Sequence, residues 1–96
     1  WLMLQADEPD DYVVGTGTSY SVRDFLGFAF GHVGLDWERH VRFDDRYLRP
    51  SEVDDLVADP ARTRDRLGWN ARTLVPELAA LMVDSDLAAL GVSARP

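Results

Sequence analysis

RYLRPSEVD, residues 46–54, is the stretch around which the rest of this chain is organised. It places Arg49 directly before Pro50 and puts Glu52 three residues after the arginine. The proline restricts the preceding residue to extended backbone, so the direction of the Arg49 side chain is set in advance. A guanidinium can fork onto phosphate oxygens, and a carboxylate can accept from a pair of sugar hydroxyls. On spacing alone a plain surface ion pair is the favoured interpretation, and a site for a phosphate and a sugar is the alternative.

Length and composition exclude several classes of function. Ninety-six residues allow one small domain, and 46% hydrophobic residues predict a folded chain. The net charge of −7 leaves no basic face for nucleic acid and disfavours an anionic membrane surface. No apolar run is long enough to span a bilayer. The chain has no cysteine, which excludes disulfides and thiolate metal sites and is compatible with a cytoplasmic protein.

The first long helix is predicted over residues 22–33. Ser21 is typical of an N-cap, and Asp24 three residues later forms a variant of the capping box. Gly34 is expected to end the helix in a left-handed conformation. The expected buried face follows the helical spacing of its apolar residues: Val22, Phe25, Leu26, Ala29, Phe30 and Val33.

Two further helices are predicted in the second half of the chain. Asp59 is expected to cap one of them, with Pro60 at its first position and Gly68 just past its end. Thr73 is the expected cap of the last helix, and Pro76 is tolerable in its first turn. The expected buried stripe of that last helix consists of Leu74, Leu78, Leu81 and Met82, extended by Leu87 and Leu90.

Short strands are expected between these three main helices, which gives an α+β fold class. The aromatic and β-branched runs at residues 12–14 and 41–43 are typical of strands, and residues 53–58 fit a short strand or an extended arm. The apolar residues 1–6 are interpreted as the tail end of a truncated helix. Residues 93–96 are interpreted as a frayed tail.

The remaining glycine, histidine and tryptophan motifs are better explained by structural roles than by binding of a cofactor, a metal or a base. The Gly15–Gly17 turn is not a dinucleotide loop, because the third glycine of that fingerprint would fall at Tyr20. His32 and His40 lack metal-ligand spacing, so both are interpreted as structural, and no metal site is predicted. The three tryptophans at positions 1, 37 and 69 favour packing of a small core over stacking on a base. Asp44 and Asp54 flank the Arg49 stretch and are candidate partners that orient Arg46 or Arg49.

Several motifs in fixed order resemble the carboxy-terminal part of GDP-mannose 4,6-dehydratases. These enzymes belong to the extended short-chain dehydrogenase family, within the NAD-dependent epimerase/dehydratase superfamily of nucleotide-sugar enzymes. The resemblance runs from residue 1 to about residue 90. It is carried by the opening WLMLQ at 1–5, DDYVV at 10–14, SVR at 21–23, VGLDW at 33–37, the 44–54 stretch, Asp59-Pro60 and LGW at 67–69.

The resemblance implies that residues 1–92 are the substrate-binding lobe of a larger Rossmann-type α/β enzyme, whose cofactor domain lies outside this chain. It implies that Arg49 and Glu52 hold the nucleotide of GDP-mannose, with Arg46 and Tyr47 as secondary candidates. NADP would be bound by the other domain, and the whole enzyme would be a homo-oligomer. The family's Tyr-x-x-x-Lys catalytic pair cannot be present, because this chain contains no lysine. No catalytic or cofactor-binding residue is therefore assigned to it.

Two alternatives stay open at the level of sequence. The motifs are partly shared with other nucleotide-sugar epimerases and reductases, so one of these is the first alternative. The second alternative is a stand-alone, non-catalytic binding domain, which the missing glycine loop and the absence of lysine would fit. Comparing GDP-mannose with UDP- and dTDP-sugars would separate the dehydratase from the first alternative.

Overall fold

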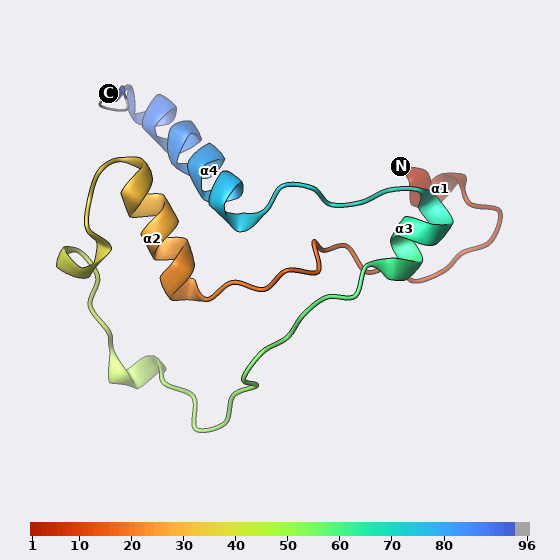
Figure 1. Cartoon of the computed structure of the whole chain (residues 1–96), viewed down its shortest axis with the longest axis horizontal. Coiled ribbons are helices and arrows are strands. Elements are labelled where there is room, and N and C mark those ends of the chain that lie inside the picture. Colours follow the sequence, from red (N-terminus) through yellow and green to blue (C-terminus); the bar gives the residue numbers. More distant parts are fainter. Residues whose placement is uncertain (94–96) are drawn as a thin grey trace. The chain divides into compact units, whose positions relative to one another are not determined.

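The computed structural model describes residues 1–93, and Figure 1 traces their path. The elements are α1 (Leu2–Gln5), α2 (Val22–His32), α3 (Ala61–Leu67) and α4 (Val75–Leu90), with short 3-10 helices η1 (Trp37–Arg39) and η2 (Asp45–Tyr47). Among the described residues, no helix is long and apolar enough to cross a membrane. The chain forms two compact units. Unit 1 contains residues 1–19 and 55–73, and unit 2 contains residues 20–54 and 74–93 of the described chain.

Helix α2 of unit 2 begins and ends as the sequence predicts. The Ser21 hydroxyl accepts from the Asp24 backbone N–H, and the Asp24 carboxylate accepts from the Ser21 N–H, both at 3.0 Å. This is a complete capping box. At the other end, Gly34 has a φ of 73° and the Leu35 N–H donates to the Phe30 carbonyl at 2.9 Å. The glycine is required there because a side chain would be strained in that conformation.

Helices α2 and α4 pack side by side and form the core of unit 2 (Figure 1). Ala79 of α4 is completely buried at this contact. The imidazole Nε2 of His32 lies 2.7 Å from an Asp84 carboxylate oxygen, which ties the two helices together. The predicted face of α2 is confirmed from Phe25 to Val33, where its residues are half-buried. The exception is Val22, which is 78% exposed because it lies in the first turn.

The predicted cap of α4 is wrong, and of the predicted buried stripe only the extension at Leu87 is confirmed. Leu74, not Thr73, is the N-cap residue, and no side chain caps this end. The buried side of the helix runs through Ala79 and the half-buried Val83 and Leu87. The predicted stripe Leu74, Leu78, Leu81 and Met82 is exposed. The error arose because α4 is apolar on two faces, and α2 packs against the face with the smaller residues.

In unit 1, polar contacts join α3 to the loop at residues 10–13. The expected helical turn near the start of the chain is confirmed as α1. Asp59 accepts from the Ala61 N–H at 3.0 Å, but Pro60 is the N-cap residue, so α3 starts one residue later than predicted. Thr63 is only 2% exposed, and its hydroxyl donates to the Val13 carbonyl at 2.6 Å. Gly68 ends the helix with a φ of 64°, as predicted.

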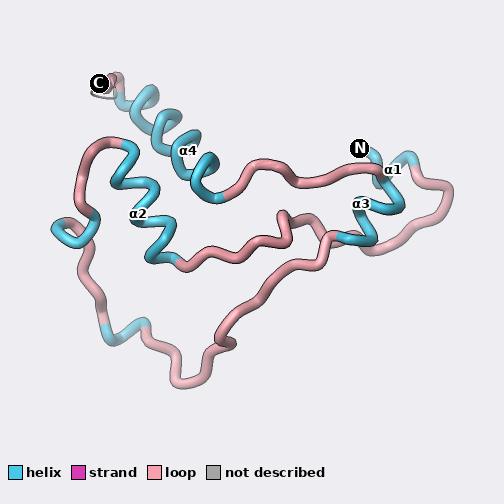
Figure 2. Tube along the Cα trace, viewed as in Figure 1, coloured by secondary structure: helices cyan, strands magenta, loops and turns pink. Residues whose placement is uncertain are grey.

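The predicted strands are not present, and Figure 2 shows loops where they were expected. A strand needs a neighbour that accepts and donates along its backbone. The carbonyl of Val13 instead accepts from Thr63, and the N–H of Val41 donates to the Trp37 carbonyl at 3.1 Å. For residues 53–58, the strand alternative is likewise wrong. The larger α/β enzyme around this helical piece stays a prediction, and residues 94–96 of the expected tail lie outside the described residues.

Candidate functional site

The four candidate residues lie in one exposed loop of unit 2, around and after η2. Asp44 begins this 3-10 turn by accepting from the backbone N–H of Arg46 at 3.0 Å. The turn presents Arg46 and Tyr47, and extended backbone follows at Leu48. The candidates Arg49 and Glu52 come next along the loop. The sequence spacing thus places all four side chains on one short, solvent-facing segment.

Arg46 is held firmly by Asp44. Its Nη2 lies 2.6 Å from Asp44 Oδ2, and its Nε donates to both carboxylate oxygens at 3.1 Å. The hydrogen bonds from Arg46 lower the pKa of the Asp44 carboxyl. The same contact raises the pKa of the Arg46 guanidinium. The predicted orienting role of Asp44 is confirmed for Arg46, and this arginine has less capacity left for a ligand.

The Arg49–Glu52 pair is looser. Arg49 Nε and Glu52 Oε2 are 3.7 Å apart, which is an ion-pair distance but beyond a normal hydrogen bond. The two side chains are 75% and 62% exposed. Each group is therefore close to a countercharge while keeping its donors or acceptors free for a ligand. A diphosphate can meet the guanidinium, and vicinal hydroxyls can meet the carboxylate.

Tyr47 adds an exposed aromatic ring to this loop. The ring is 80% exposed, and the guanidinium carbon of Arg46 lies 5.9 Å from its centroid. This distance is within the range of a cation–π contact. Arg46 therefore contacts Asp44 through hydrogen bonds and Tyr47 through its aromatic ring. These three residues come directly before the Arg49–Glu52 pair in the loop.

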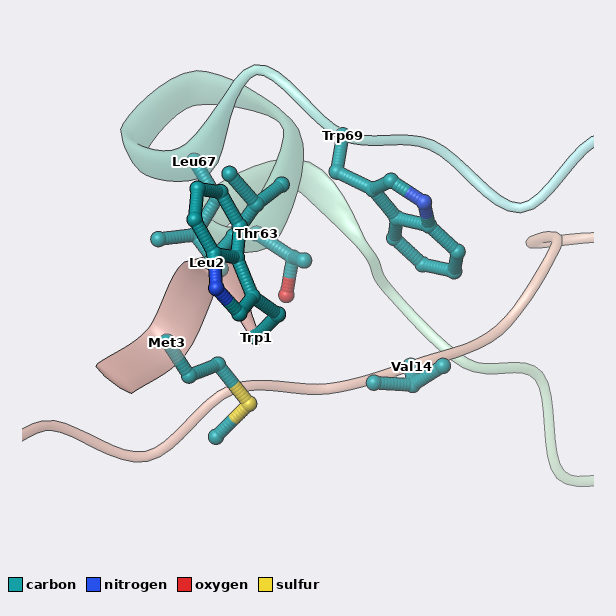
Figure 3. A pocket seen from close by; sticks show the side chains of 7 residues that line it. All are labelled: Trp1, Leu2, Met3, Val14, Thr63, Leu67 and Trp69. Atoms are coloured by element: carbon teal, nitrogen blue, oxygen red, sulfur yellow. The ribbon is translucent and has the colours of Figure 1, made fainter. Parts of the chain in front are cut away.

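An apolar cleft in unit 1 was not predicted from the sequence. It has a volume of about 480 Å³ and is shown in Figure 3. Its lining residues are Trp1, Leu2, Met3, Val14, Thr63, Leu67 and Trp69. The signal was the run of large apolar residues at 1–4, which was interpreted only as a helix end. Because the Thr63 hydroxyl is already bonded to Val13, the cleft offers apolar contact and no acid or base.

The tryptophans only partly serve as the predicted core. Trp69 is 41% exposed and Trp1 is 84% exposed, so neither closes a sealed interior. Trp37 in unit 2 is half-buried. Its ring meets Phe43 edge-to-face with centroids 6.5 Å apart, and the Arg23 guanidinium lies 5.9 Å from its centroid. Packing thus accounts for Trp37 better than stacking on a base.

The described residues do not fit a dinucleotide cofactor. A Cβ added to Gly15 would lie 2.7 Å from the Ala58 Cβ, and one added to Gly17 would lie 3.5 Å from Pro60. Gly15 is thus needed for close packing within unit 1, and Gly17 is needed for its positive φ of 80°. They also do not open a helix, because α2 begins only at Val22. A dinucleotide fingerprint needs its glycine turn at the start of a helix.

Metal ligation is not favoured by the described residues either. Residues 1–93 contain no group of three His, Cys, Asp or Glu side chains that could hold an ion. His32 pairs with Asp84, and the ring of His40 stacks on Phe30 with centroids 5.5 Å apart. The interpretation of both histidines as structural residues agrees with these contacts.

Comparisons with known proteins identify the family. The family model described as "GDP-mannose 4,6 dehydratase" matches residues 1–82. The chain is 49% identical to GDP-mannose 4,6 dehydratase 1 of Arabidopsis thaliana over 87 residues, which covers 91% of this chain and 24% of that protein. It is 38% identical to the human GDP-mannose 4,6 dehydratase over 104 residues, covering 91% and 28%. The relative from Vibrio cholerae is 34% identical over 114 residues, covering 91% and 31%.

This chain spans about a quarter of the length of the curated relatives it matches. The match corresponds to a carboxy-terminal part of these enzymes. The family model covers most of the chain, and the motifs that carry the resemblance lie largely within the matched range. The chain therefore belongs to the GDP-mannose 4,6-dehydratase family.

Proposed function

We propose that this chain is the nucleotide-binding part of a GDP-mannose 4,6-dehydratase. The observation that carries the proposal is the open Arg49–Glu52 pair, 3.7 Å apart on an exposed loop, in a chain of this family. The proposed partners are GDP-mannose, or a related nucleotide sugar, and the remainder of the same polypeptide. A cytoplasmic, homo-oligomeric enzyme is the expectation that goes with this proposal.

In the proposed complex, Arg49 donates to the diphosphate and Glu52 accepts from the ribose hydroxyls. The approach of a ligand would break no hydrogen bond between these two side chains, because they make only a long ion pair. Arg46 is already bonded to Asp44, so we assign it to supporting the loop and to adding positive potential. The exposed ring of Tyr47 offers an apolar surface to the nucleotide.

The role proposed for this chain is orientation rather than chemistry. The whole enzyme would convert GDP-mannose to GDP-4-keto-6-deoxymannose by oxidation at C4, loss of water across C5 and C6, and return of the hydride. NADP is the proposed cofactor. The described residues do not fit NADP and include no lysine, so no bond-making step is assigned to them. Binding energy from the nucleotide, remote from the reacting sugar, would hold that sugar in place.

The experiment uses a hybrid dehydratase, in which this chain replaces the region it matches in the Arabidopsis thaliana enzyme. In the hybrid, Arg49→Ala removes a charge-assisted contact to the nucleotide. We expect GDP-mannose binding to weaken by about 2 kcal/mol, or about thirtyfold, when measured by calorimetric titration. Binding of NADP should not change.

Arg39→Ala is the matched control. Arg39 is 82% exposed and forms an i,i+3 ion pair with Asp36 at 3.8 Å, much as Arg49 does with Glu52. This control should leave the affinity for GDP-mannose unchanged. Equal affinities of the Arg49→Ala and Arg39→Ala variants would show that the loop does not hold the nucleotide. Titration with UDP- and dTDP-sugars would test the preference for guanosine.

A further inference from the structure

Helix α4 has a second apolar stripe, whose residues are exposed. We define the outer face as Leu74, Leu78, Leu81 and Met82, whose positions follow the i, i+4, i+7, i+8 spacing of one helical stripe. These side chains are between 38% and 55% exposed. Another side of the helix, which carries the buried Ala79 and the half-buried Val83 and Leu87, packs against α2.

The outer face has the character of a contact surface. At 100° per residue, it continues toward the end of α4 through the small residues Ser85, Ala88 and Ala89. The nearest acids, Glu77, Asp84 and Asp86, lie on its flanks, and Asp84 is tied to His32. A helix that is apolar around most of its circumference is normally buried. Contiguous apolar surface of this kind marks an interaction site.

We propose that the outer face of α4 is the surface on which the amino-terminal part of a full-length dehydratase packs. This inference rests on the proposed function, in which the chain acts as part of a longer enzyme. The relatives are about four times as long as the region that this chain matches, and that region is carboxy-terminal in them. A family-length polypeptide thus brings a large body of additional chain to this helix, already linked to it covalently.

A second copy of this chain is a poorer occupant. The outer face offers four large side chains over a few turns of one helix. A stable interface between separate proteins uses about 20–30 residues on each side. A covalently linked neighbour needs far less surface, because the linkage gives a high effective concentration. The expected partner surface is apolar, and a cation at its rim would meet Glu77.

The test is the double substitution Leu78→Gln and Leu81→Gln, made in the hybrid dehydratase and in the isolated 96-residue chain. Glutamine has nearly the helix propensity of leucine, so α4 itself should persist. We expect the thermal unfolding midpoint of the hybrid to fall by about 5 °C. The circular dichroism and unfolding midpoint of the isolated chain should not change, because Leu78 and Leu81 are exposed in it.

Val92→Gln is the matched control. Val92 is 53% exposed, close to the 55% of Leu81, but lies beyond the end of α4. It should shift neither midpoint. If the double variant of the hybrid fails to fold, the single Leu81→Gln variant supplies a measurable midpoint.

An unchanged midpoint of the hybrid would overturn the proposal. So would an isolated chain that is dimeric by light scattering and becomes monomeric on the double substitution, since the outer face would then join two copies. The nucleotide site is tested independently: Arg49→Ala should lower GDP-mannose affinity without lowering the midpoint. Failure of one proposal can thus be told from failure of the other.

Discussion

Two arginines, three positions apart in the same exposed loop, are held in different ways. Arg46 makes several hydrogen bonds to Asp44, which sits two residues before it and starts the 3-10 turn. Arg49 only approaches Glu52, at 3.7 Å. The difference follows from local backbone geometry, since η2 brings Asp44 and Arg46 into register. One arginine therefore shapes the loop, and the other is available to a ligand.

The Asp44–Arg46 contact predicts a specific pH dependence. Pairing lowers the pKa of Asp44 in the folded protein. The contact therefore contributes stability above the ordinary pKa of an aspartate, and this contribution is lost as the pH falls through the lowered value. Carboxyl NMR titration should show Asp44 titrating below its ordinary range, and Arg46→Gln should return it toward that range. An identical titration in both proteins would contradict the hydrogen bonds seen here.

Thr63 is the buried polar residue of unit 1, and its single hydroxyl bond predicts a measurable cost. Thr63→Val keeps the shape of the side chain but leaves the Val13 carbonyl without its donor. We expect the free energy of unfolding to fall by about 1–2 kcal/mol in urea denaturation. Thr63→Ser, which keeps the hydroxyl, should lose less. The exposed Thr73→Val is the surface control and should have little effect.

At the scale of the elements, Ser21 and Thr73 were both expected to cap helices, but only Ser21 does so. Ser21→Ala removes half of a reciprocal capping box and should lower the free energy of unfolding by about 1 kcal/mol. Thr73→Ala should cost little, because α4 begins after Leu74 without a side-chain cap. Urea denaturation of both variants tests this difference. Equal losses of unfolding free energy in the two variants would mean that the Ser21 capping box adds no stability of its own.

The helices could be predicted from the sequence because their signals are local. Ser21 and Asp24 define a start, and Gly34 and Gly68 define ends, within a few residues of the elements themselves. The absence of strands could not be predicted, because a strand forms only if a distant segment pairs with it through backbone hydrogen bonds. In this structure the Val13 carbonyl accepts a hydrogen bond from the Thr63 hydroxyl instead.

The buried side of α4 also could not be chosen from the sequence. Periodicity identifies apolar stripes, but it does not say which stripe faces a particular neighbour. Leu78 and Leu81 are larger and more apolar than Ala79, so they were the natural choice for the core. In the structure Ala79 is buried where α2 and α4 pack closely, and Leu78 and Leu81 are exposed. The four candidate site residues were predictable as one loop, because they are adjacent in the sequence.

At the scale of the whole molecule, each compact unit is assembled from two separate stretches of chain. The family was recognisable from the sequence alone, because its motifs recur in fixed order along most of the chain, and the comparisons confirm it. The division into two units was not foreseen. It depends on long-range contacts such as that of Gly15 with Ala58, which no local pattern encodes.

Two glycine substitutions should act in opposite directions. Gly15→Ala places a methyl group 2.7 Å from the Ala58 Cβ and should destabilise unit 1 by about 1–3 kcal/mol through overpacking. Gly27→Ala lies within α2 with no atom within 4 Å of the new methyl group, and it should stabilise unit 2 by about 0.5–1 kcal/mol. Denaturation followed by helix signal and by tryptophan fluorescence checks both. Similar shifts for the two variants would contradict the packing described for unit 1.

The pairing of α2 with α4 has a consequence during synthesis on the ribosome. Residues 33–74 separate the two helices, so α2 leaves the exit tunnel well before its partner has been translated. Its apolar side, from Phe25 to Val33, must stay without its native neighbour throughout that interval. Nascent chains with such surface are open to misassembly and to capture by chaperones. Unit 2 is therefore completed only when α4 emerges and can pack against α2.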